Sequence, residues 1–274
     1  MRGELCTFLA ATAEVTPVVA PEVRPLDAVE FARLKLGFEP DARQAEVLRS
    51  EAARGILNCS RQWGKSTVAA AKAVHRAWTR KGCLVLVASP SARQSRLFLR
   101  KAADMLRKMK IRPRKDADNP ISLLFPNGSR IVGVPGKEET VRGFSGVSLL
   151  LIDEASRVPE EMYTALRPML ATERGDLWLM STPKGRSGFF YDVWEHGGAE
   201  WHRVRVPATE CGRIAPEALE EQRSGMDAAE FRQEFLTEFT EDGAGVFDWE
   251  VVEAALDEGE APLKLRLRFV KRER

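Results

Sequence analysis

Short apolar runs alternate with stretches of helical spacing along most of the chain. A run of about four to eight apolar residues is typical of a buried strand, and strands that alternate with helices form a mainly parallel sheet. The pattern therefore predicts an α/β fold with helices on both faces of one central sheet. The runs that we interpret as buried strands are "GILNC" (55–59), "CLVLVAS" (83–89), "VSLLLIDE" (147–154), "DLWLMS" (176–181) and "WHRVRV" (201–206).

The stretches between these runs predict helices and one hairpin. Asp27 and Asp41 are suited to cap helices over about 27–36 and 41–53. The segments "ISLLF" and "SRIVGV" are joined by Asn127-Gly128, and they predict a β-hairpin because Asn-Gly favours a tight turn. Further helices are expected near 66–78, 91–110, 159–170, 187–195, 216–223 and 227–237.

Composition indicates a globular protein and argues against several other classes. Of the 274 residues 44% are hydrophobic and 30% are charged, and the net charge of +2 does not by itself indicate nucleic-acid binding. No run approaches the ~20 apolar residues that span a bilayer. Glu4 and Glu14 interrupt the apolar N-terminal stretch, which argues against a signal peptide. The four cysteines form no C-x-x-C pair, so we expect a reduced compartment and no zinc site.

The segment "CSRQWGKST" (59–67) has the pattern of a phosphate-binding loop between a strand and a helix. The common form is G-x-x-x-x-G-K-[ST], and here Cys59 replaces the first glycine. Backbone N–H groups and the helix N-terminus of such a loop bind phosphate. Lys65 is placed to reach the β- and γ-phosphates, and the Ser66 hydroxyl to bind Mg²⁺. A chance G-K-S sequence at a helix start is the alternative.

Two other side chains of the loop each have two interpretations. Arg61 is placed to lie along the phosphates and offset transition-state charge, or it is a surface arginine. Trp63 either stacks near the nucleotide or fills a gap under the loop.

An acidic pair ends the strand "LLLID" and strengthens the case for a nucleotide site. Asp153 in this position can hold the Mg²⁺ shell, and Glu154 can orient or deprotonate a water molecule. Two acidic residues that merely cap a strand end are the alternative. Because the loop and the acidic strand occur together, we predict ATP binding, and Glu154 favours hydrolysis.

Together these segments resemble the ATPase domain of the large terminase subunit of tailed phages. The resemblance implies a P-loop NTPase of the additional-strand catalytic-Glu type, with a mainly parallel central sheet flanked by helices and a small helical lid. It also implies that ATP hydrolysis, with Mg²⁺, powers the movement of double-stranded DNA into a phage procapsid. The segments that carry it are "SRQWGKST", "LLLIDEAS", "LMSTPKGRSGFFYDVW", "LLFPNGSRIVGVPGKEETVRGFSG" and "EFRQEFLTEF".

The resemblance assigns roles residue by residue. Glu154, Arg61 and Arg142 are the implied catalytic residues, with Ser66 and Asp153 holding Mg²⁺. Arg142 would enter a neighbouring subunit's site, unless it is a solvated loop residue. The implied ATP-binding residues are Gln44, Ser60, Arg61, Gln62, Trp63, Gly64, Lys65, Ser66 and Thr67.

Two further assignments concern the adenine base and movement. Gln44 matches an adenine-contacting glutamine of the family, and a helix-surface glutamine is the alternative. Ser181, Thr182 and Pro183 match the motif that couples hydrolysis to movement.

The implied domain organisation has three parts. We expect a flexible tail at 1–25, and an ATPase domain at 26–240 with a helical lid from about 26–54 and 207–240. Residues 241–274 would be a linker or the truncated start of a nuclease domain. Full-length large terminases continue into a nuclease domain with clustered carboxylates, and this sequence ends too early for that fold. We therefore expect no nuclease activity in this chain.

Residues 91–115 contain ten lysines and arginines and only one acidic residue, Asp104. Such a face neutralises DNA phosphates without reading sequence, as a motor requires. A solvated helix whose apolar stripe (Leu97, Leu99, Met105, Leu106) packs on the sheet is the alternative. Phe98 is the only aromatic residue there, which favours duplex DNA over stacked single strands. The residues that we assign to DNA contact are Arg93, Arg96, Arg100, Lys101, Arg107 and Lys108.

The family resemblance also implies partners and a location. These are double-stranded DNA, the phage portal protein, the small terminase subunit and further copies of this chain in a ring, in the cytoplasm of the bacterial host and without a membrane. A helicase-like ATPase is one alternative, although such enzymes usually need two domains of this kind. A non-catalytic nucleotide-binding prophage remnant is another, and the intact Lys65, Asp153 and Glu154 count against it.

Overall fold

A twisted sheet of eight strands forms the centre of the protein. The computed structural model describes residues 26–116, 119–136 and 143–241, so the predicted tail at 1–25 and nearly all of the segment 241–274 lie outside the described residues. The strands are β1 (Arg54–Cys59), β2 (Leu84–Ser89), β3 (Arg114–Asp116), β4 (Asn119–Leu124), β5 (Arg130–Pro135), β6 (Val147–Asp153), β7 (Asp176–Ser181) and β8 (Trp201–Val206). Their order across the sheet is β3-β4-β5-β2-β6-β7-β1-β8.

The sheet is parallel from β5 to β8 and antiparallel at the other edge. Strands β5, β2, β6, β7, β1 and β8 pair in parallel. Strands β3 and β4 pair antiparallel with their neighbours, so the predicted hairpin is confirmed as β4–β5. All five predicted buried strands are present. Strand β3 was not predicted, because Arg114-Lys115-Asp116 contains no apolar residue.

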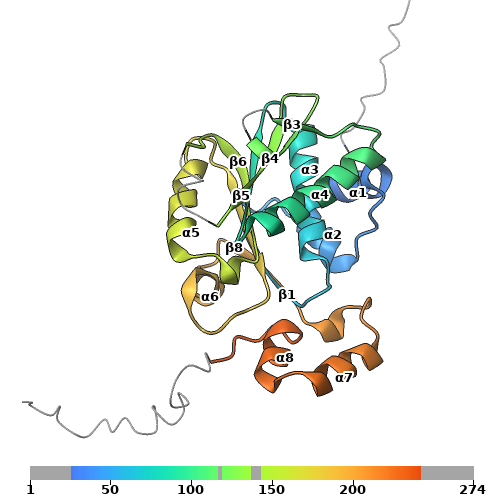
Figure 1. Ribbon diagram of the computed structural model, residues 1–274, viewed down its shortest axis with the longest axis vertical. Coiled ribbons are helices and arrows are strands. Elements are labelled where there is room, and N and C mark those ends of the chain that lie inside the picture. Colours follow the sequence, from blue (N-terminus) through green and yellow to red (C-terminus); the bar gives the residue numbers. More distant parts are fainter. Residues whose placement is uncertain (1–25, 117–118, 137–142, 242–274) are drawn as a thin grey trace, which may run out of the picture.

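Helices cover both faces of the sheet. Figure 1 shows α3 and α4 against one face, with α1 and α2 outside them, and α5 and α6 against the other. The helices are α1 (Ala28–Leu36), α2 (Ala42–Arg49), α3 (Lys65–Thr79), α4 (Ala92–Lys108), α5 (Glu160–Leu166), α6 (Gly188–His196), α7 (Pro216–Gly225) and α8 (Ala228–Glu234). Short 3-10 turns are η2 (Ala155–Arg157), η3 (Arg167–Leu170) and η4 (Ala208–Glu210). Within the described residues no helix combines the length and the apolar character that crossing a membrane requires.

Alternation along each strand divides the core into two layers. Successive side chains of a strand point to opposite faces. Thus Leu151 packs in the cluster under α3 and α4, whereas Leu150 and Ile152 pack in the cluster under α5 and α6. Both layers are fully buried, which explains why the strands appear in the sequence as continuous apolar runs.

The predicted N-caps are confirmed, and two predicted helix ends are wrong. Asp27 and Asp41 each form a capping box at the start of α1 and α2. Helix α2 ends at Arg49, four residues before the predicted end at 53. Helix α5 gives way to the 3-10 turn η3, which contains Pro168, a residue without the N–H that an α-helix needs.

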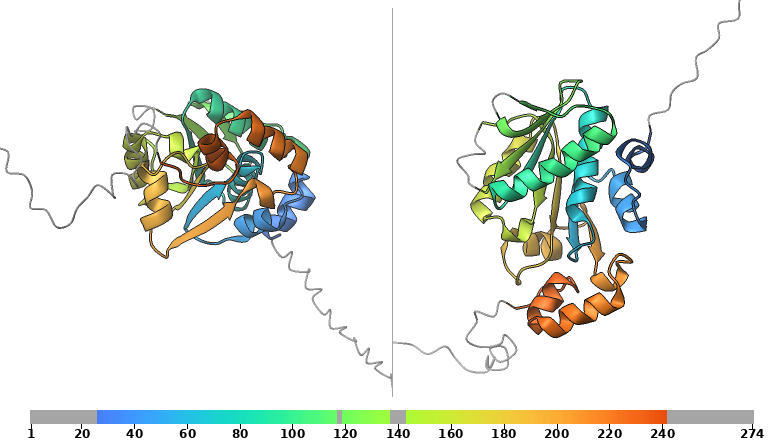
Figure 2. Two further views of the ribbon diagram at one scale, coloured as in Figure 1. Left: turned by 90° about the horizontal axis from the view of Figure 1, so that it is seen from below. Right: turned by 45° about the vertical axis from the view of Figure 1, so that its right-hand side comes forward.

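Helices α7 and α8 pack on a small cluster of their own. Ala208, Phe231 and Phe235 form its buried part, and α7 buries no residue fully. By contrast, α1 and α2 contribute to the main core on the α3 side. Figure 2 shows α7 and α8 lying beyond one end of the sheet, next to the β1–α3 junction. This end is the carboxyl edge of the parallel strands.

Candidate active site

The carboxyl ends of neighbouring parallel strands meet at one edge and bring the predicted motifs together. Strand β7 lies between β6 and β1, so the acidic pair after β6 and the loop after β1 flank the end of β7. The Ser66 Oγ donates to Asp153 Oδ1 at 3.4 Å, although 87 positions separate the two residues. Open α/β sheets bind ligands at this edge.

The loop between β1 and α3 has the backbone conformation that its glycine permits. Gly64 is the N-cap of α3 with φ 98°, in the left-handed region that favours glycine. A Cβ atom at this position would also lie 3.0 Å from Arg213 Nη1 and 3.2 Å from Gln44 Nε2. The N–H of Ser60 donates to Val206 O at 2.8 Å and that of Arg61 to Glu234 O at 2.9 Å, which fixes the entry to the loop.

Cys59 fits the first loop position as a small apolar residue. It is fully buried, and burial raises the pKa of its thiol to about 12, so the thiol is neutral. Its Sγ lies 3.8 Å from Val204 O. The replacement of the usual glycine therefore introduces no charge into the loop.

Lys65 is a buried cation that faces the end of its own strand. Its Nζ donates to Cys59 O at 2.7 Å and to Ser60 O at 3.0 Å. Burial lowers the pKa of Lys65, and the carboxylates of Glu154 and Asp153 oppose that shift. The ammonium group thus lies in a dry site beside acidic groups, where it is available to a phosphate ligand.

Asp153 ends β6 as a buried carboxyl group. Burial, with a smaller contribution from neighbouring Glu154, raises the pKa of Asp153 to about 6. The positive charges of Lys101 and Lys65 and the Ser66 hydrogen bond act in the opposite direction. A cation at this position would offset the cost of burying the carboxylate.

A chain of four charged side chains crosses the site. Glu154 follows β6 with φ 53°, and its Oε2 accepts from Arg157 Nη1 at 3.1 Å. Arg157 Nη2 donates to Glu234 Oε1 at 2.6 Å, and Arg61 Nε lies 3.3 Å from Glu234 Oε2. We call these residues, Arg61, Glu234, Arg157 and Glu154, the Arg–Glu chain. It links the phosphate loop to the predicted catalytic carboxylate through α8.

The segment predicted to couple hydrolysis to movement also contacts this chain. Ser181, Thr182 and Pro183 are all buried at the end of β7. Arg157 Nη1 donates to Thr182 Oγ1 at 3.3 Å, and the hydroxyl groups of Ser181 and Ser156 are 2.8 Å apart. The end of β7 is therefore hydrogen-bonded to the turn that carries Glu154.

Gln44 and Trp63 support the loop from inside. Trp63 is 1% exposed and belongs to the core cluster, so it fills the space under the loop. Gln44 is fully buried, which excludes the helix-surface alternative. Its Nε2 donates to Trp63 O at 2.8 Å, and its Oε1 accepts from Asp41 N at 3.0 Å and from Arg213 Nη2 at 2.7 Å.

Three participants were missed by the sequence analysis, and one predicted participant lies outside the described residues. Arg157, Glu234 and Arg213 touch site residues but belong to no recognisable motif. The only signal was position, since Arg157 comes three residues after Glu154. Arg142 lies outside the residues that the structure describes.

The basic face predicted for DNA lies on α4, with one correction to its apolar stripe. Arg93, Arg96, Arg100 and Lys101 are exposed. Arg107 pairs with Asp104, and Lys108 Nζ donates to Gly37 O at 3.2 Å. Leu97 is 45% exposed and does not belong to the packed stripe, which consists of Phe98, Leu99, Ala102, Ala103, Met105 and Leu106.

A basic groove runs beside this helix. Its volume is about 400 Å³, and α4 and the β3–β4 pair form its walls. Leu99, Ala103 and Ile121 contribute apolar surface. The cations that line it are Arg96, Arg100, Arg107, Arg114 and Lys115. Phe98 is buried and cannot stack on a base.

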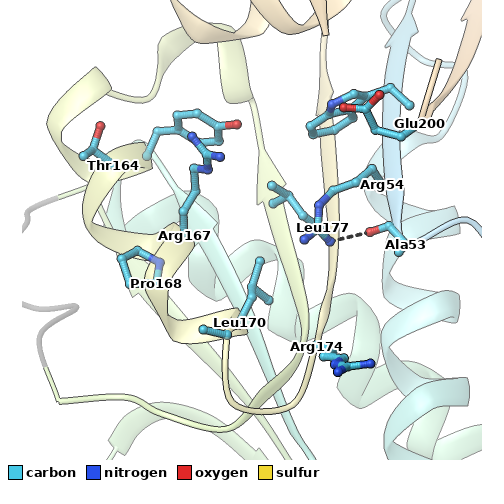
Figure 3. Close-up of a pocket in the computed structure, with 12 residues that line it drawn as sticks. Ala53, Arg54, Thr164, Arg167, Pro168, Leu170, Arg174, Leu177 and Glu200 are labelled. Atoms are coloured by element: carbon cyan, nitrogen blue, oxygen red, sulfur yellow. Dashed lines mark hydrogen bonds between the residues drawn. The ribbon is translucent and has the colours of Figure 1, made fainter. Parts of the chain in front are cut away.

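A larger cavity opens at the opposite, amino edge of the sheet (Figure 3). Its volume is about 780 Å³, and the starts of β1, β7 and β8 line it together with α5 and η3. Arg54 Nη1 donates to Ala53 O at 2.8 Å and Gly175 O at 2.9 Å, and Arg167 lies over the ring of Tyr163. These arginines are bound within the fold, and no sequence motif of the site lies here.

Comparison with known proteins identifies a family. Residues 56–252 match the family described as "Terminase large subunit, T4likevirus-type, N-terminal". Over 261 residues the chain is 26% identical to the terminase large subunit of Thermus phage G20c, which covers 82% of this chain and 53% of that protein. The chain thus spans about half the length of the curated relatives it matches.

Solved structures agree with this assignment at the level of the fold. The ATPase domain of the large terminase from Thermus phage P74-26 superposes with a TM-score of 0.69 and 22% identity, over 79% of this chain and 100% of that domain. A large terminase from a thermophilic bacteriophage, in complex with ATP-gamma-S, gives 0.63 and 15%, over 73% and 52%. The family match covers more than half of the chain, and the protein therefore belongs to the terminase large subunits of tailed phages, with the matched residues in their N-terminal ATPase domain.

Proposed function

We propose that this chain hydrolyses ATP in a Mg²⁺-dependent reaction and that the reaction moves double-stranded DNA into a phage procapsid. The observation that carries the proposal is the contact of Ser66 Oγ with Asp153 Oδ1, beside the buried Lys65. It joins the two parts between which nucleotide hydrolases hold a triphosphate. Support also comes from the family and from the thermophilic phage's large terminase, which was solved in complex with ATP-gamma-S.

The sheet order supports a P-loop NTPase of the additional-strand catalytic-Glu type. One strand, β7, separates the phosphate-loop strand β1 from the acidic strand β6. Glu154 follows β6 and can reach the space between them. We assign α7 and α8 to the helical lid, because they pack beside the loop and outside the main core.

Ser66 and Asp153 fit a magnesium ion. Hydroxyl and carboxylate oxygens are the ligands that Mg²⁺ prefers, and a pKa of about 6 leaves Asp153 ionised at neutral pH. A bound Mg²⁺ would bridge phosphate oxygens and reduce their negative charge.

The side chains of the loop would bind and polarise the triphosphate. Lys65 would exchange the carbonyl oxygens of Cys59 and Ser60 for phosphate oxygens, which are stronger acceptors. Arg61, whose side chain is 59% exposed, would turn toward the same phosphates. Glu154 would orient the attacking water and accept its proton.

The end of β7 is placed to report loss of phosphate to the rest of the protein. Thr182 and Glu154 share Arg157 as a donor, so a shift of Glu154 changes the bonding of Thr182. Ser181 is bonded to the same turn through Ser156. We propose that this connection couples hydrolysis to movement of the DNA-binding surface.

The groove beside α4 is the surface that we assign to DNA. Its cations and those of α4 can neutralise the phosphates of any sequence, and their pairing with duplex DNA would make binding fall steeply with salt. DNA that stimulates ATP hydrolysis without strand separation would support a packaging motor over a helicase-like ATPase.

The remaining assignments follow from the family. A ring of this chain with the portal protein and the small terminase subunit, in the bacterial cytoplasm, is the expected working assembly. Arg142 would act on a neighbouring subunit there, so an isolated subunit is expected to hydrolyse ATP slowly.

A steady-state ATPase assay on Glu154→Gln tests the proposal. Loss of the general base should lower kcat by about 10²–10⁴ while nucleotide binding persists. Glu161→Gln, the same change at an exposed position of α5, is the matched control. Equal turnover in wild type and Glu154→Gln would contradict the catalytic assignment. It would favour the non-catalytic nucleotide-binding alternative.

A further inference from the structure

Helix α8 places a buried carboxylate directly against the phosphate loop. The Glu234 side chain is 8% exposed, and its Oε2 lies 3.3 Å from Arg61 Nε. The backbone makes a second connection, because the N–H of Arg61 donates to Glu234 O at 2.9 Å. Both the side chain and the main chain of Glu234 therefore contact the same loop residue.

The other oxygen of the same carboxylate binds the arginine that holds Glu154. Arg157 Nη2 donates to Glu234 Oε1 at 2.6 Å, and Arg157 Nη1 donates to Glu154 Oε2 at 3.1 Å. In the Arg–Glu chain two guanidinium groups thus alternate with two carboxylates, and the charges balance. A buried carboxylate is stable only with such partners, and removal of one partner changes the bonding of the next.

A triphosphate would compete with Glu234 for Arg61. Each guanidinium nitrogen that bonds a phosphate oxygen is lost to the carboxylate, and phosphate oxygens carry more charge. When Arg61 leaves, Glu234 retains Arg157 alone, and Arg157 is then drawn away from Glu154. The loop and the catalytic carboxylate would change state together.

Helices α7 and α8 are well placed to respond to this exchange. They rest on the small cluster around Phe231 and Phe235, which is separate from the two main layers of the core. A shift of α8 would therefore disturb few core contacts. Glu234 ends α8, so a change in its bonding acts at the point where the helix meets the site.

We propose that Glu234 is a positioning residue that latches the nucleotide-free site through Arg61 and Arg157, and that the triphosphate releases the latch by taking Arg61. The proposal rests on the ATPase function proposed above. It has two consequences of opposite sign. Glu234 weakens nucleotide binding because it competes for Arg61, and it supports turnover because it draws Arg157 from Glu154.

Nucleotide binding and turnover by Glu234→Gln test the latch. Calorimetric titration of the full chain with ATP-gamma-S should give about three- to tenfold tighter binding than wild type, the range expected for coupled charged neighbours. The kcat for ATP should fall by about tenfold at the same time. Glu230→Gln, an exposed position on the same helix, should change neither quantity.

A double variant separates a latch from a merely structural role. In the Arg61→Ala background, Glu234→Gln should no longer tighten binding, because the competition has been removed. Glu234→Asp keeps the charge but shortens the side chain, and it should show a smaller, Arg61-dependent tightening even if Glu234→Gln folds poorly.

The outcomes distinguish the two proposals. Wild-type protein that binds nucleotide but shows no Arg61-dependent tightening in either Glu234 variant would overturn the latch alone. Weaker binding by both variants, independent of Arg61, would assign Glu234 a structural role and also overturn it. Wild-type protein that binds neither ATP-gamma-S nor ADP would overturn the ATPase proposal together with the latch.

Discussion

The two edges of the parallel sheet differ in a way that separates space from chemistry. The amino edge holds the larger cavity, about 780 Å³, with Arg54 and Arg167 among its walls. The carboxyl edge holds the buried Lys65 and Asp153 and the Arg–Glu chain. Cavity size is the usual first guide to a ligand site. In this protein, converging buried charges point to the opposite edge.

The physical reason lies in how each edge satisfies its polar groups. At the amino edge Arg54 is bonded to the carbonyls of Ala53 and Gly175, so its charge closes the fold. At the carboxyl edge, within the described residues, the buried hydroxyls of Ser60 and Ser89 have no hydrogen-bond partner. Buried polar atoms without partners are costly unless a ligand or water satisfies them. The difference indicates which edge is adapted to a ligand.

The largest contrast between the edges is expected in nucleotide binding. Lys65→Ala should weaken ATP-gamma-S binding by about 100-fold or more, since a buried charge-assisted contact is lost. Arg174→Ala, in the wall of the amino-edge cavity, should change binding less than twofold. Calorimetric titration measures both. A stronger effect of Arg174 than of Lys65 would reverse the assignment of the edges.

Carboxylates at the two ends of neighbouring strands should respond to neutralisation with opposite signs. The raised pKa of Asp153 means that the unfolded chain ionises first, so wild-type stability falls as the pH rises from about 4 to about 6. Asp153→Asn removes that cost and should stabilise the nucleotide-free protein by about 2–3 kcal/mol above pH 6, and not near pH 4. Asp176→Asn should destabilise it, because Arg76 loses its carboxylate partner.

Thermal or urea unfolding across this pH range checks both substitutions. If Asp153→Asn were destabilising at pH 8, the carboxylate would have a favourable partner that the site geometry does not contain.

Two buried tryptophans offer a smaller contrast between stability and function. Trp63→Leu and Trp178→Leu should each lower stability by roughly 1–3 kcal/mol, less than truncation to alanine. Only Trp63→Leu should also weaken nucleotide binding, since Trp63 supports the loop and Trp178 donates to Ala52 O at the amino edge. Unfolding and titration of both variants test this, and equal loss of binding would mean that general destabilisation is the cause.

The smallest expected effect concerns DNA. Arg100→Ala in the basic groove should weaken duplex binding a few-fold and reduce the salt dependence by about one phosphate contact. Arg167→Ala, at the amino edge, serves as the control for loss of an exposed arginine. Fluorescence anisotropy at several salt concentrations would show the difference. Unchanged salt dependence in Arg100→Ala would remove this residue from the DNA surface.

The sequence by itself determined the elements of the fold and the principal chemistry. The buried strands, the hairpin and the helix caps at Asp27 and Asp41 follow from local periodicity and capping, which act over a few residues. The pairing of the phosphate loop with Asp153 was also predicted, because each belongs to a motif with a defined place at a strand end.

Only the tertiary structure decided which further side chains complete the site. Glu234 meets Arg61 and Arg157 across more than 70 positions of sequence, and no periodicity connects them. The burial of Trp63 and Gln44, and the exposure of Leu97, likewise depend on which neighbours pack against each helix. Local patterns record what a residue prefers, whereas the packing of distant segments determines what it contacts.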